Sequence, residues 1–285
     1  MVSEILSPEN WFLILLGFVW IIGAVLQDLH RREVDNLWNF LLVGFALAYR
    51  LSISIYIGDY WFILNGILGF ALFIGLGNLF YYSKLFAGGD AKLMMALGTV
   101  LPLSYDWLVN LKVFGVFILL FLIGGSIYAL IWAFSLVIIN WKRFSREFVK
   151  QWINYKNLFL IALVFSVLWV GFAFAISQLN LMLIGLIVLL FPVLFVFAKS
   201  VEESCMIKAI KPSKISEGDW LYEDILIGGK KIKSNWEGVS KKELALIKRK
   251  CKQKILIKFG IPFTPAFLFG FVGLLWLVLN FGEWF

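Results

Sequence analysis

Long apolar runs separated by short charged stretches dominate the chain. Each run approaches the roughly 20 residues needed to cross about 30 Å of hydrocarbon, and none shows the short alternating segments of a membrane barrel. The pattern therefore predicts an all-α polytopic membrane protein with about eight transmembrane helices. The predicted helices lie near residues 11–28, 37–57, 61–82, 90–104, 111–139, 158–177, 180–198 and 260–281. The fourth of them is short and the fifth is long.

The one long polar stretch, from Lys199 to Lys258, predicts a small cytosolic subdomain. Ser240 followed by Glu243 has the spacing of a capping box, so we expect a basic helix that runs from there through Lys258 to the last span. These patterns divide the chain into four parts. The parts are residues 1–140, an N-terminal membrane region; 141–198, a cytosolic loop with a helical hairpin; 199–258, the cytosolic subdomain; and 259–285, the last transmembrane helix.

Composition and charge support a membrane location. With 61% hydrophobic and 15% charged residues, the 285-residue chain has too little polar surface to cover a soluble domain. If the N-terminus is outside, every Lys and Arg except Arg50 and Lys112 falls on the inner side. Positive loop residues stay cytoplasmic, so this asymmetry predicts the orientation in the plasma membrane. The net charge of +8 then reflects topology and attraction to lipid headgroups, not nucleic-acid binding.

Processing signals and metal ligands are not expected. No Lys or Arg precedes the apolar run from Trp11 to Gln27, and no small-residue cleavage site follows it, so we expect a first span and not a secretory signal. Cys205 and Cys251 both lie in the segment assigned to the cytosol, which argues against a disulfide, and their spacing fits no zinc site. We therefore predict neither a metal nor a cofactor.

Two aspartates stand at the ends of predicted helices on the same side of the membrane. Asp28 ends the first helix, and Asp90 opens the fourth directly after Gly88 and Gly89. Two crossings separate these helix ends, so both acids are expected at the inner leaflet at similar depth. A carboxylate there is costly unless it faces protein or water, which makes both residues functional candidates.

Two neighbouring carboxylates provide chemistry for amide hydrolysis. They do not both ionise readily, so such a pair shares a proton; the ionised member activates a water and the protonated member polarises a peptide carbonyl. Gly88 and Gly89 are expected to let the backbone bend and approach closely before Asp90. Two alternatives stay open: Asp90 as a simple helix cap, and Asp35 or Glu33 as the true second carboxylate.

The residues around these aspartates resemble a known family. The sequence DLHRREVDN at 28–36, then hydrophobic helices, then AGGDAK at 87–92 is similar to the type IV prepilin peptidases. The resemblance is closest to their archaeal branch, the preflagellin peptidases, which are polytopic GxGD aspartyl proteases. It implies that Asp28 and Asp90 are the catalytic pair, and that a six-helix peptidase core here carries an extra hairpin.

The chain departs from the family pattern at several places. Ala87 stands at the first glycine of GxGD, and Val34–Asp35 replaces the Ile-Pro of many relatives. The four-cysteine zinc domain of the bacterial enzymes is absent, so the resemblance implies no methyltransferase activity. The extra hairpin, 158–177 with 180–198, bears on substrate specificity more than on catalysis.

Further residues are expected to support the pair. The stretch from Gly260 to Phe267 resembles the proline-containing start of the family's last helix, although prolines in a first helical turn explain it equally well. Lys92 is positioned to act on Asp90 or substrate carbonyls, or simply to anchor a helix end at the headgroups. Asn36 and Asn39 are expected to hydrogen-bond the turn that positions Asp28. The supporting residues are Gly88, Gly89, Lys92, Asn36, Pro262 and Pro265.

The resemblance implies a membrane aspartyl endopeptidase that removes a short basic leader from prepilin-like or preflagellin precursors at the cytoplasmic face. Its partners are then the precursor and membrane lipids, with no nucleic acid. Acidic side chains of the cytosolic segment are positioned to attract a basic leader, although a solvated surface explains them as well. These acidic residues are Glu202, Glu203, Glu217, Asp219, Glu223 and Asp224.

Two rival functions use the same aspartates. A presenilin-like or signal-peptide-peptidase-like intramembrane protease carries a Pro-Ala-Leu element, which residues 265–267 match only in part, and Asp28 follows Gln27 where that class has Tyr. An ion-coupled transporter binding cations at the two aspartates would show internal repeats and polar residues near mid-bilayer. Arg50 is the one clear residue of that kind, and snorkelling accounts for it.

Overall fold

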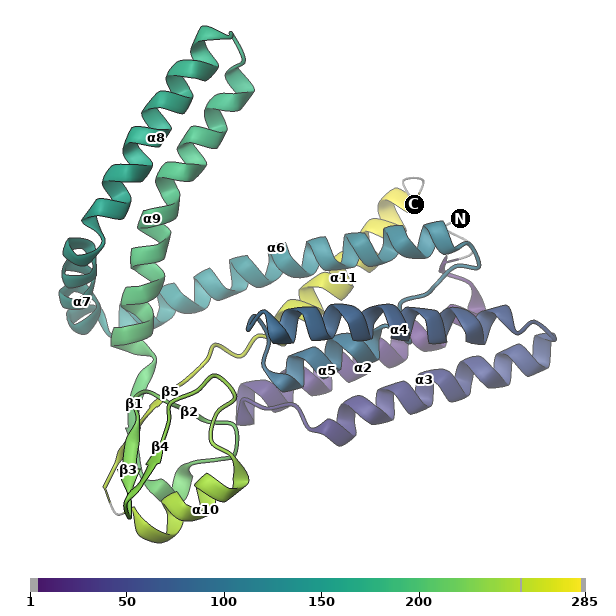
Figure 1. Ribbon diagram of the computed structural model, residues 1–285. Coiled ribbons are helices and arrows are strands. Elements are labelled where there is room, and N and C mark those ends of the chain that lie inside the picture. The colour runs from purple at the N-terminus through teal and green to yellow at the C-terminus, as the bar shows by residue number, and fades with distance from the viewer. Residues whose placement is uncertain (1–4, 252, 283–285) are drawn as a thin grey trace. The chain divides into compact units, whose positions relative to one another are not determined.

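Six helices in the described part of the chain are long and apolar enough to cross a membrane. They are α2 (Pro8–Arg31), α3 (Asn36–Ile57), α4 (Trp61–Tyr82), α6 (Trp107–Ile139), α8 (Lys156–Ala175) and α9 (Leu179–Cys205) (Figure 1). A seventh apolar helix, α11 (Pro265–Phe281), is shorter. The prediction of a multi-spanning helical membrane protein is confirmed, whereas the predicted count of eight exceeds these six.

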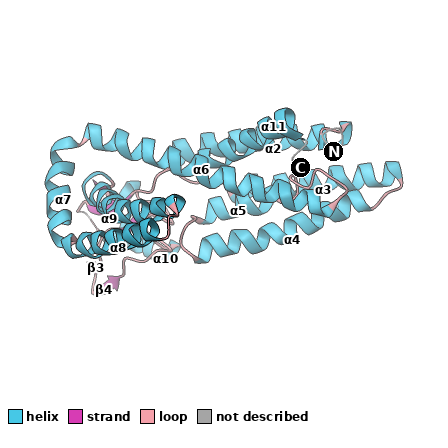
Figure 2. Cartoon of the chain, turned by 90° about the horizontal axis from the view of Figure 1, so that it is seen from above, coloured by secondary structure: helices cyan, strands magenta, loops and turns pink. Residues whose placement is uncertain are grey.

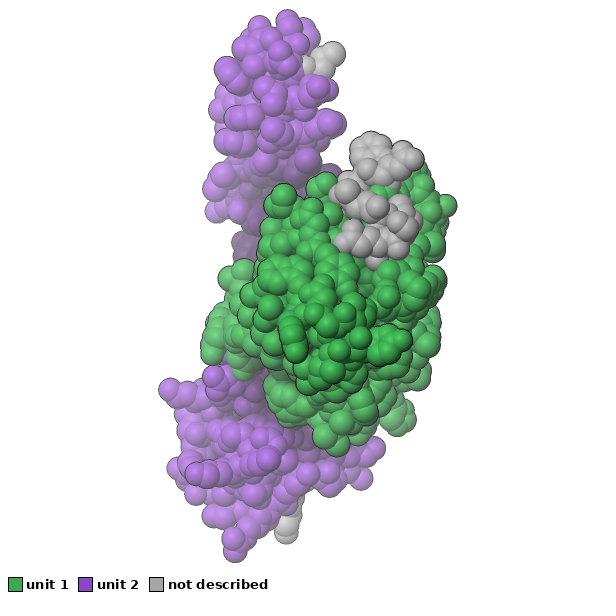
Figure 3. Space-filling view, turned by 90° about the vertical axis from the view of Figure 1, so that its right-hand side faces the viewer, with its two compact units in different colours: residues 1–130, 261–285 green, residues 131–260 purple. Residues whose placement is uncertain are grey.

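The computed structural model describes residues 5–251 and 253–282. The chain divides into two compact units, drawn in two colours in Figure 3. Unit 1 comprises residues 1–130 and 261–285, and unit 2 comprises residues 131–260. In unit 1 the helices run side by side along one direction (Figure 2), so that the end of α2 and the start of α3 lie at one end of the bundle.

The fourth predicted helix is shorter than expected. α5 (Gly88–Leu97) has ten residues, and the chain from Gly98 to Asp106 is irregular, so the predicted helix 90–104 is wrong over its second half. Pro102 explains the early end, because it has no N–H to continue a helix and disfavours helical backbone at Leu101. The irregular stretch nevertheless stays inside the bundle, since residues 98–104 are all buried.

Buried non-helical backbone needs hydrogen-bond partners, because no water reaches it in the middle of a membrane. The last carbonyls of this stretch accept hydrogen bonds from side chains near the starts of α2 and α4. Asn10 Nδ2 donates to Leu103 O at 2.6 Å, Asn65 Nδ2 donates to Ser104 O at 3.2 Å, and Trp61 Nε1 donates to Tyr105 O at 3.0 Å. The chain from α5 to residue 105 therefore runs the length of unit 1.

The side chain of Arg50 donates hydrogen bonds to the first half of the same stretch. Its side chain is fully buried, and the guanidinium donates to Thr99 O at 2.8 Å and to Pro102 O at 2.5 Å, with a longer bond to Val100 O at 3.3 Å. A fourth bond, at 3.0 Å, reaches Phe62 O in the first turn of α4. The expectation that Arg50 snorkels to the membrane surface was wrong: it satisfies the carbonyls beyond the end of α5.

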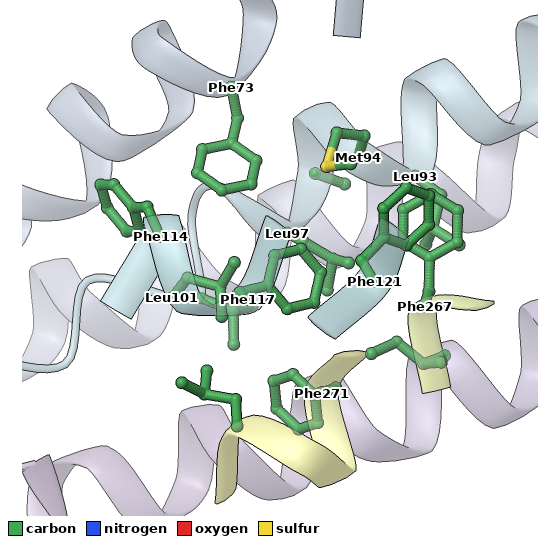
Figure 4. Packing of buried hydrophobic residues seen from close by; sticks show 14 of the residues in the cluster. Phe73, Leu93, Met94, Leu97, Leu101, Phe114, Phe117, Phe121, Phe267 and Phe271 are labelled. Atoms are coloured by element: carbon green, nitrogen blue, oxygen red, sulfur yellow. The ribbon is translucent and has the colours of Figure 1, made fainter. Parts of the chain in front are cut away.

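The core of unit 1 forms around α5. Leu93, Met94 and Leu97 are fully buried and face rings from α6 and α11 (Figure 4). Phe121 and Phe267 are the closest pair in this ring cluster, with centroids 4.7 Å apart. α4 and α5 approach each other so closely that a Cβ on Gly98 would overlap Gly69 O. Only glycine, which has no Cβ, avoids this overlap.

Unit 2 contains the end of α6, then α7 (Trp141–Asn154), α8 and α9, and a small region of short strands with one helix. Its elements are β1 (Ile207–Ile210), a 3-10 turn (Pro212–Lys214), β2 (Trp220–Leu221), β3 (Ile225–Ile227), β4 (Lys230–Ile232), α10 (Lys241–Lys250) and β5 (Ile255–Lys258). The three-stranded antiparallel sheet has the order β1-β5-β2, with Ile207 opposite Lys258, and β3 and β4 form a separate hairpin.

This strand region corrects two predictions. The chain is not all-α, and the basic helix does not reach Lys258, because α10 ends at Lys250 and β5 follows. The alternation in β5 explains the change of structure, since Ile255 and Ile257 are buried while their neighbours are more exposed. The predicted capping box is confirmed: Ser240 Oγ accepts the Glu243 N–H, and the Glu243 carboxylate accepts the Ser240 N–H at 3.0 Å.

Candidate active site

Asp28 lies in the last turn of α2 and is held by the first residues of α11. Its side chain is 6% exposed, and its Oδ2 accepts hydrogen bonds from Thr264 Oγ1 at 2.9 Å and from Thr264 N at 3.1 Å. A carboxylate at a helix C-terminus opposes the helix dipole. Here the N-terminus of α11, where Thr264 is the N-cap residue, offsets that cost with its own positive end.

Pro262 and Pro265 flank this contact. Both side chains are buried, and Pro265 occupies the first position of α11. Because a proline has no N–H, Thr264 supplies a backbone donor at a point where its neighbour Pro265 has none. The structure therefore associates the proline-containing stretch with Asp28 through Thr264, a residue that the sequence pattern did not single out.

Asp90 is the third residue of α5, and its carboxylate accepts the backbone N–H of Ala87. This is the acidic half of a capping box, with Ala87 and not Asp90 at the N-cap. Asp28 lies within electrostatic range of Asp90.

The other two acidic candidates lie in an exposed turn. Asp35 forms an ion pair with Arg31 at 2.8 Å, with both side chains more than half exposed. Glu33 is exposed as well. Their surroundings are solvated, which favours Asp90 over either of them as the partner of Asp28.

The start of α5 is hydrogen-bonded to the first turn of α3. Lys92 Nζ donates to Asn36 Oδ1 at 2.6 Å, and Asn39 Nδ2 donates to Gly89 O at 3.4 Å. We expected the two asparagines to stabilise the turn that carries Asp28; in the structure they contact α5 instead. Each therefore helps to fix the position of Asp90, which is one residue from Gly89 and two from Lys92.

The two glycines before Asp90 differ in what the fold demands of them. A Cβ on Gly89 would lie 3.3 Å from Val34 N, so this glycine lets the turn after α2 pack closely against α5. A Cβ on Gly88 would meet nothing nearer than Tyr81, at 4.0 Å. Neither glycine has a positive φ. Close approach at Gly89, and not a bend, is therefore the structural requirement.

α6 contributes a residue that the sequence pattern did not indicate. A Cβ on Gly125 would lie 2.7 Å from the Phe263 ring, so α6 approaches the start of α11 closely. Tyr128, about one turn further along α6, has a buried hydroxyl oxygen and lies within electrostatic range of Asp28. The sequence signal that could have indicated Tyr128 is a phenol within a largely apolar helix. Among the described residues, no cluster of three or more His, Cys, Asp or Glu side chains is arranged to hold a metal ion.

Fold and site together define a multi-spanning helical membrane protein built around two neighbouring aspartates. Residues 15–136 match the type IV leader peptidase family, so this region of the chain is similar to that family. The matched region contains Asp28, Asp90 and Tyr128, while Thr264 lies outside it. The resemblance predicted from the sequence is confirmed by this match.

Two curated relatives are both preflagellin peptidases. The chain is 30% identical over 134 residues to that of Methanococcus maripaludis strain C6, covering 44% of this chain and 57% of the relative. It is 31% identical over 88 residues to that of Methanocaldococcus jannaschii, covering 31% of this chain and 37% of the relative. The chain thus spans less than two thirds of the length of each of these relatives. No solved structure matches it.

Proposed function

We propose that the protein is a membrane aspartyl endopeptidase that removes the short basic leader from preflagellin-like or prepilin-like precursors. The observation that carries the proposal is the aspartate pair, with a buried Asp28 oriented by Thr264 and Asp90 within its electrostatic range. The family match of residues 15–136 and the two preflagellin peptidase relatives support the same reaction.

The different surroundings of the two carboxylates suggest their roles. Asp28 accepts two hydrogen bonds from Thr264, which suits an ionised carboxylate that takes a proton from water. Because two neighbouring carboxylates do not both ionise readily, Asp90 is the protonated partner that donates to the oxygen of the scissile carbonyl. Water then attacks the carbonyl carbon. The leaving amine takes the proton held by Asp28, and the carbonyl re-forms as its proton returns to Asp90.

We place this site at the cytoplasmic face of the plasma membrane. Arg31, Arg32, Lys84 and Lys92 all lie near the helix ends that carry the two aspartates, and positive residues of short loops remain in the cytoplasm. In this topology the stretch that follows Asp90, to residue 105, and α11 each complete a crossing, which gives eight passages in all. The strand region of unit 2 is then cytosolic.

The acidic residues of unit 2 offer little free charge for a basic leader. Four of the six predicted ones are already in ion pairs. The pairs are Glu202 with Lys199 and Lys258, Glu203 with Lys199, Glu217 with Lys241, and Asp224 with Lys231. These contacts favour a solvated structural surface over leader recognition.

The decisive experiment is cleavage of a precursor by the purified full-length protein in detergent or liposomes. A preflagellin-like precursor with a basic leader is expected to lose that leader, as measured by gel shift and by N-terminal sequencing of the product. The double variant Asp28→Asn/Asp90→Asn is the control for a contaminating protease. Equal cleavage by wild type and double variant, or none by wild type with several such precursors, would overturn the proposal.

Thr264 offers a test of how Asp28 is oriented. Replacing it by Val removes the hydroxyl donor at nearly constant volume, and a hydrogen bond to a charged group contributes about 1.5–3 kcal/mol, so turnover should fall about 10- to 100-fold. Thr264→Ser keeps the hydroxyl and should remain within a few-fold of wild type, which makes it the matched control. Initial cleavage rates at saturating precursor measure the effect. Equal rates for the Val and Ser variants would show that the hydroxyl does not orient Asp28.

A further inference from the structure

α7 has no linker on either side and joins two candidate spans. α6 ends at Ile139 and α8 begins at Lys156, so only Asn140 and Tyr155 separate α7 from its neighbours. Consecutive spans meet at the same membrane surface, and a helix tied to both at its two ends cannot leave that surface. The 14 residues of α7 extend about 21 Å at 1.5 Å per residue.

The apolar face of α7 is only partly covered by protein. Phe144 is buried, with its ring centroid 5.6 Å from that of Phe197 in α9. By contrast, Trp141, Val149 and Ile153 are each more than half exposed. A surface helix of a soluble protein would bury such residues, whereas a helix lying in a membrane interface directs them toward the acyl chains.

The polar face of α7 is strongly basic. It carries Lys142, Arg143, Arg146 and Lys150 against the single carboxylate of Glu147, which pairs with Lys150 at 3.2 Å. Within the described residues, no ion pair occupies the other three cations, and all three side chains are exposed. Unpaired cations beside exposed aromatic and aliphatic side chains match a surface of anionic headgroups over hydrocarbon.

α7, the helix that carries these cations, also lines a groove together with α9. Its volume is about 450 Å³, and its lining is entirely apolar: Phe148, Val149, Trp152 and Ile153 of α7 with Val193 of α9. Val193 lies within a candidate span, so the groove opens toward hydrocarbon. Its size and lining suit a lipid acyl chain whose headgroup would reach the basic side chains.

We propose that α7 is an interfacial lipid-binding helix, in which Lys142, Arg143 and Arg146 contact the phosphates of anionic lipids while an acyl chain occupies the groove beside Val193. This site contains neither aspartate and does not depend on the proposed peptidase function. The cations lie at the ends of the spans on the side assigned to the cytoplasm, so the lipid belongs to the inner leaflet.

Lipid retention by the full-length protein tests this proposal. The protein is reconstituted in vesicles of equal parts phosphatidylcholine and phosphatidylglycerol, re-extracted in mild detergent, and its co-purifying lipid is quantified by mass spectrometry. Wild type should retain phosphatidylglycerol in excess of its share in the vesicles. The variant Lys142→Gln/Arg143→Gln/Arg146→Gln should lose that excess, because each cation near an anionic surface contributes about a fivefold preference.

The chain offers a control of equal charge. Lys242, Lys248 and Arg249 are exposed on α10, so Lys242→Gln/Lys248→Gln/Arg249→Gln removes the same charge from the same unit. This variant should retain phosphatidylglycerol as wild type does. Filling the groove with Val193→Trp should lower the total lipid retained, because the acyl chain loses its binding groove. An unchanged excess in the α7 variant, or an equal loss in the α10 variant, would overturn the proposal.

Discussion

Cleavage should fall below detection when either Asp28 or Asp90 alone is replaced by Asn. The substitution keeps the size of the side chain and removes its acid–base function, so the loss should be about 10⁴-fold or more, as for other members of a catalytic unit. Both residues are needed in the proposed mechanism, because one takes the proton of water while the other donates to the carbonyl oxygen. Single-turnover cleavage with excess protein measures even a slow residual rate.

Two comparisons separate lost chemistry from lost structure. The amide oxygen introduced by Asp28→Asn can still accept hydrogen bonds from Thr264, so the melting temperature of this variant should stay close to that of wild type. Asp35→Asn removes a carboxylate from the neighbouring exposed turn and should leave the rate within a few-fold of wild type. If one of the two single variants stays active, Asp28 and Asp90 do not act as a pair.

Much of unit 1 is predictable from hydropathy and topology. The predicted spans 37–57 and 61–82 match α3 and α4 almost to the residue, because lipid demands apolar runs of fixed length that stop at polar residues. The neighbourhood of Asp28 and Asp90 was also predictable, since two crossings return the chain to the same side. Such inferences need only local composition and the direction of the chain.

Contacts between distant segments were not predictable in this way. Thr264 is 236 positions from Asp28, and the local sequence pattern around either residue does not indicate a contact with the other. The strands of unit 2 have two to four residues each, too few to establish a period of two before a turn interrupts it. The early end of α5 was not predictable for the same reason. The buried irregular segment that follows α5 is stable only because side chains of other helices donate hydrogen bonds to its carbonyls.

Arg50 is the residue on which that irregular segment depends most. Charged side chains inside a membrane protein are costly unless paired, yet among the described residues no carboxylate forms an ion pair with Arg50. Its partners are the carbonyls of Phe62, Thr99, Val100 and Pro102, so the positive charge faces the partial negative charges of backbone groups left without helical donors. The five N–H groups of a guanidinium suit several acceptors at once, which a lysine does not match.

Replacing Arg50 by Met should therefore destabilise the protein by about 3–5 kcal/mol, as expected when one member of a buried polar network is removed and its partners stay unsatisfied. Arg50→Lys keeps the charge but not the fork of donors and should fall between Met and wild type. Arg31→Met is the matched control, because Arg31 is exposed and its ion pair with Asp35 contributes about 0–1 kcal/mol. Thermal denaturation in detergent, followed by loss of the monodisperse peak, ranks the three. If Arg50→Met is as stable as Arg31→Met, other donors satisfy residues 99–102, and the end of α5 does not depend on Arg50.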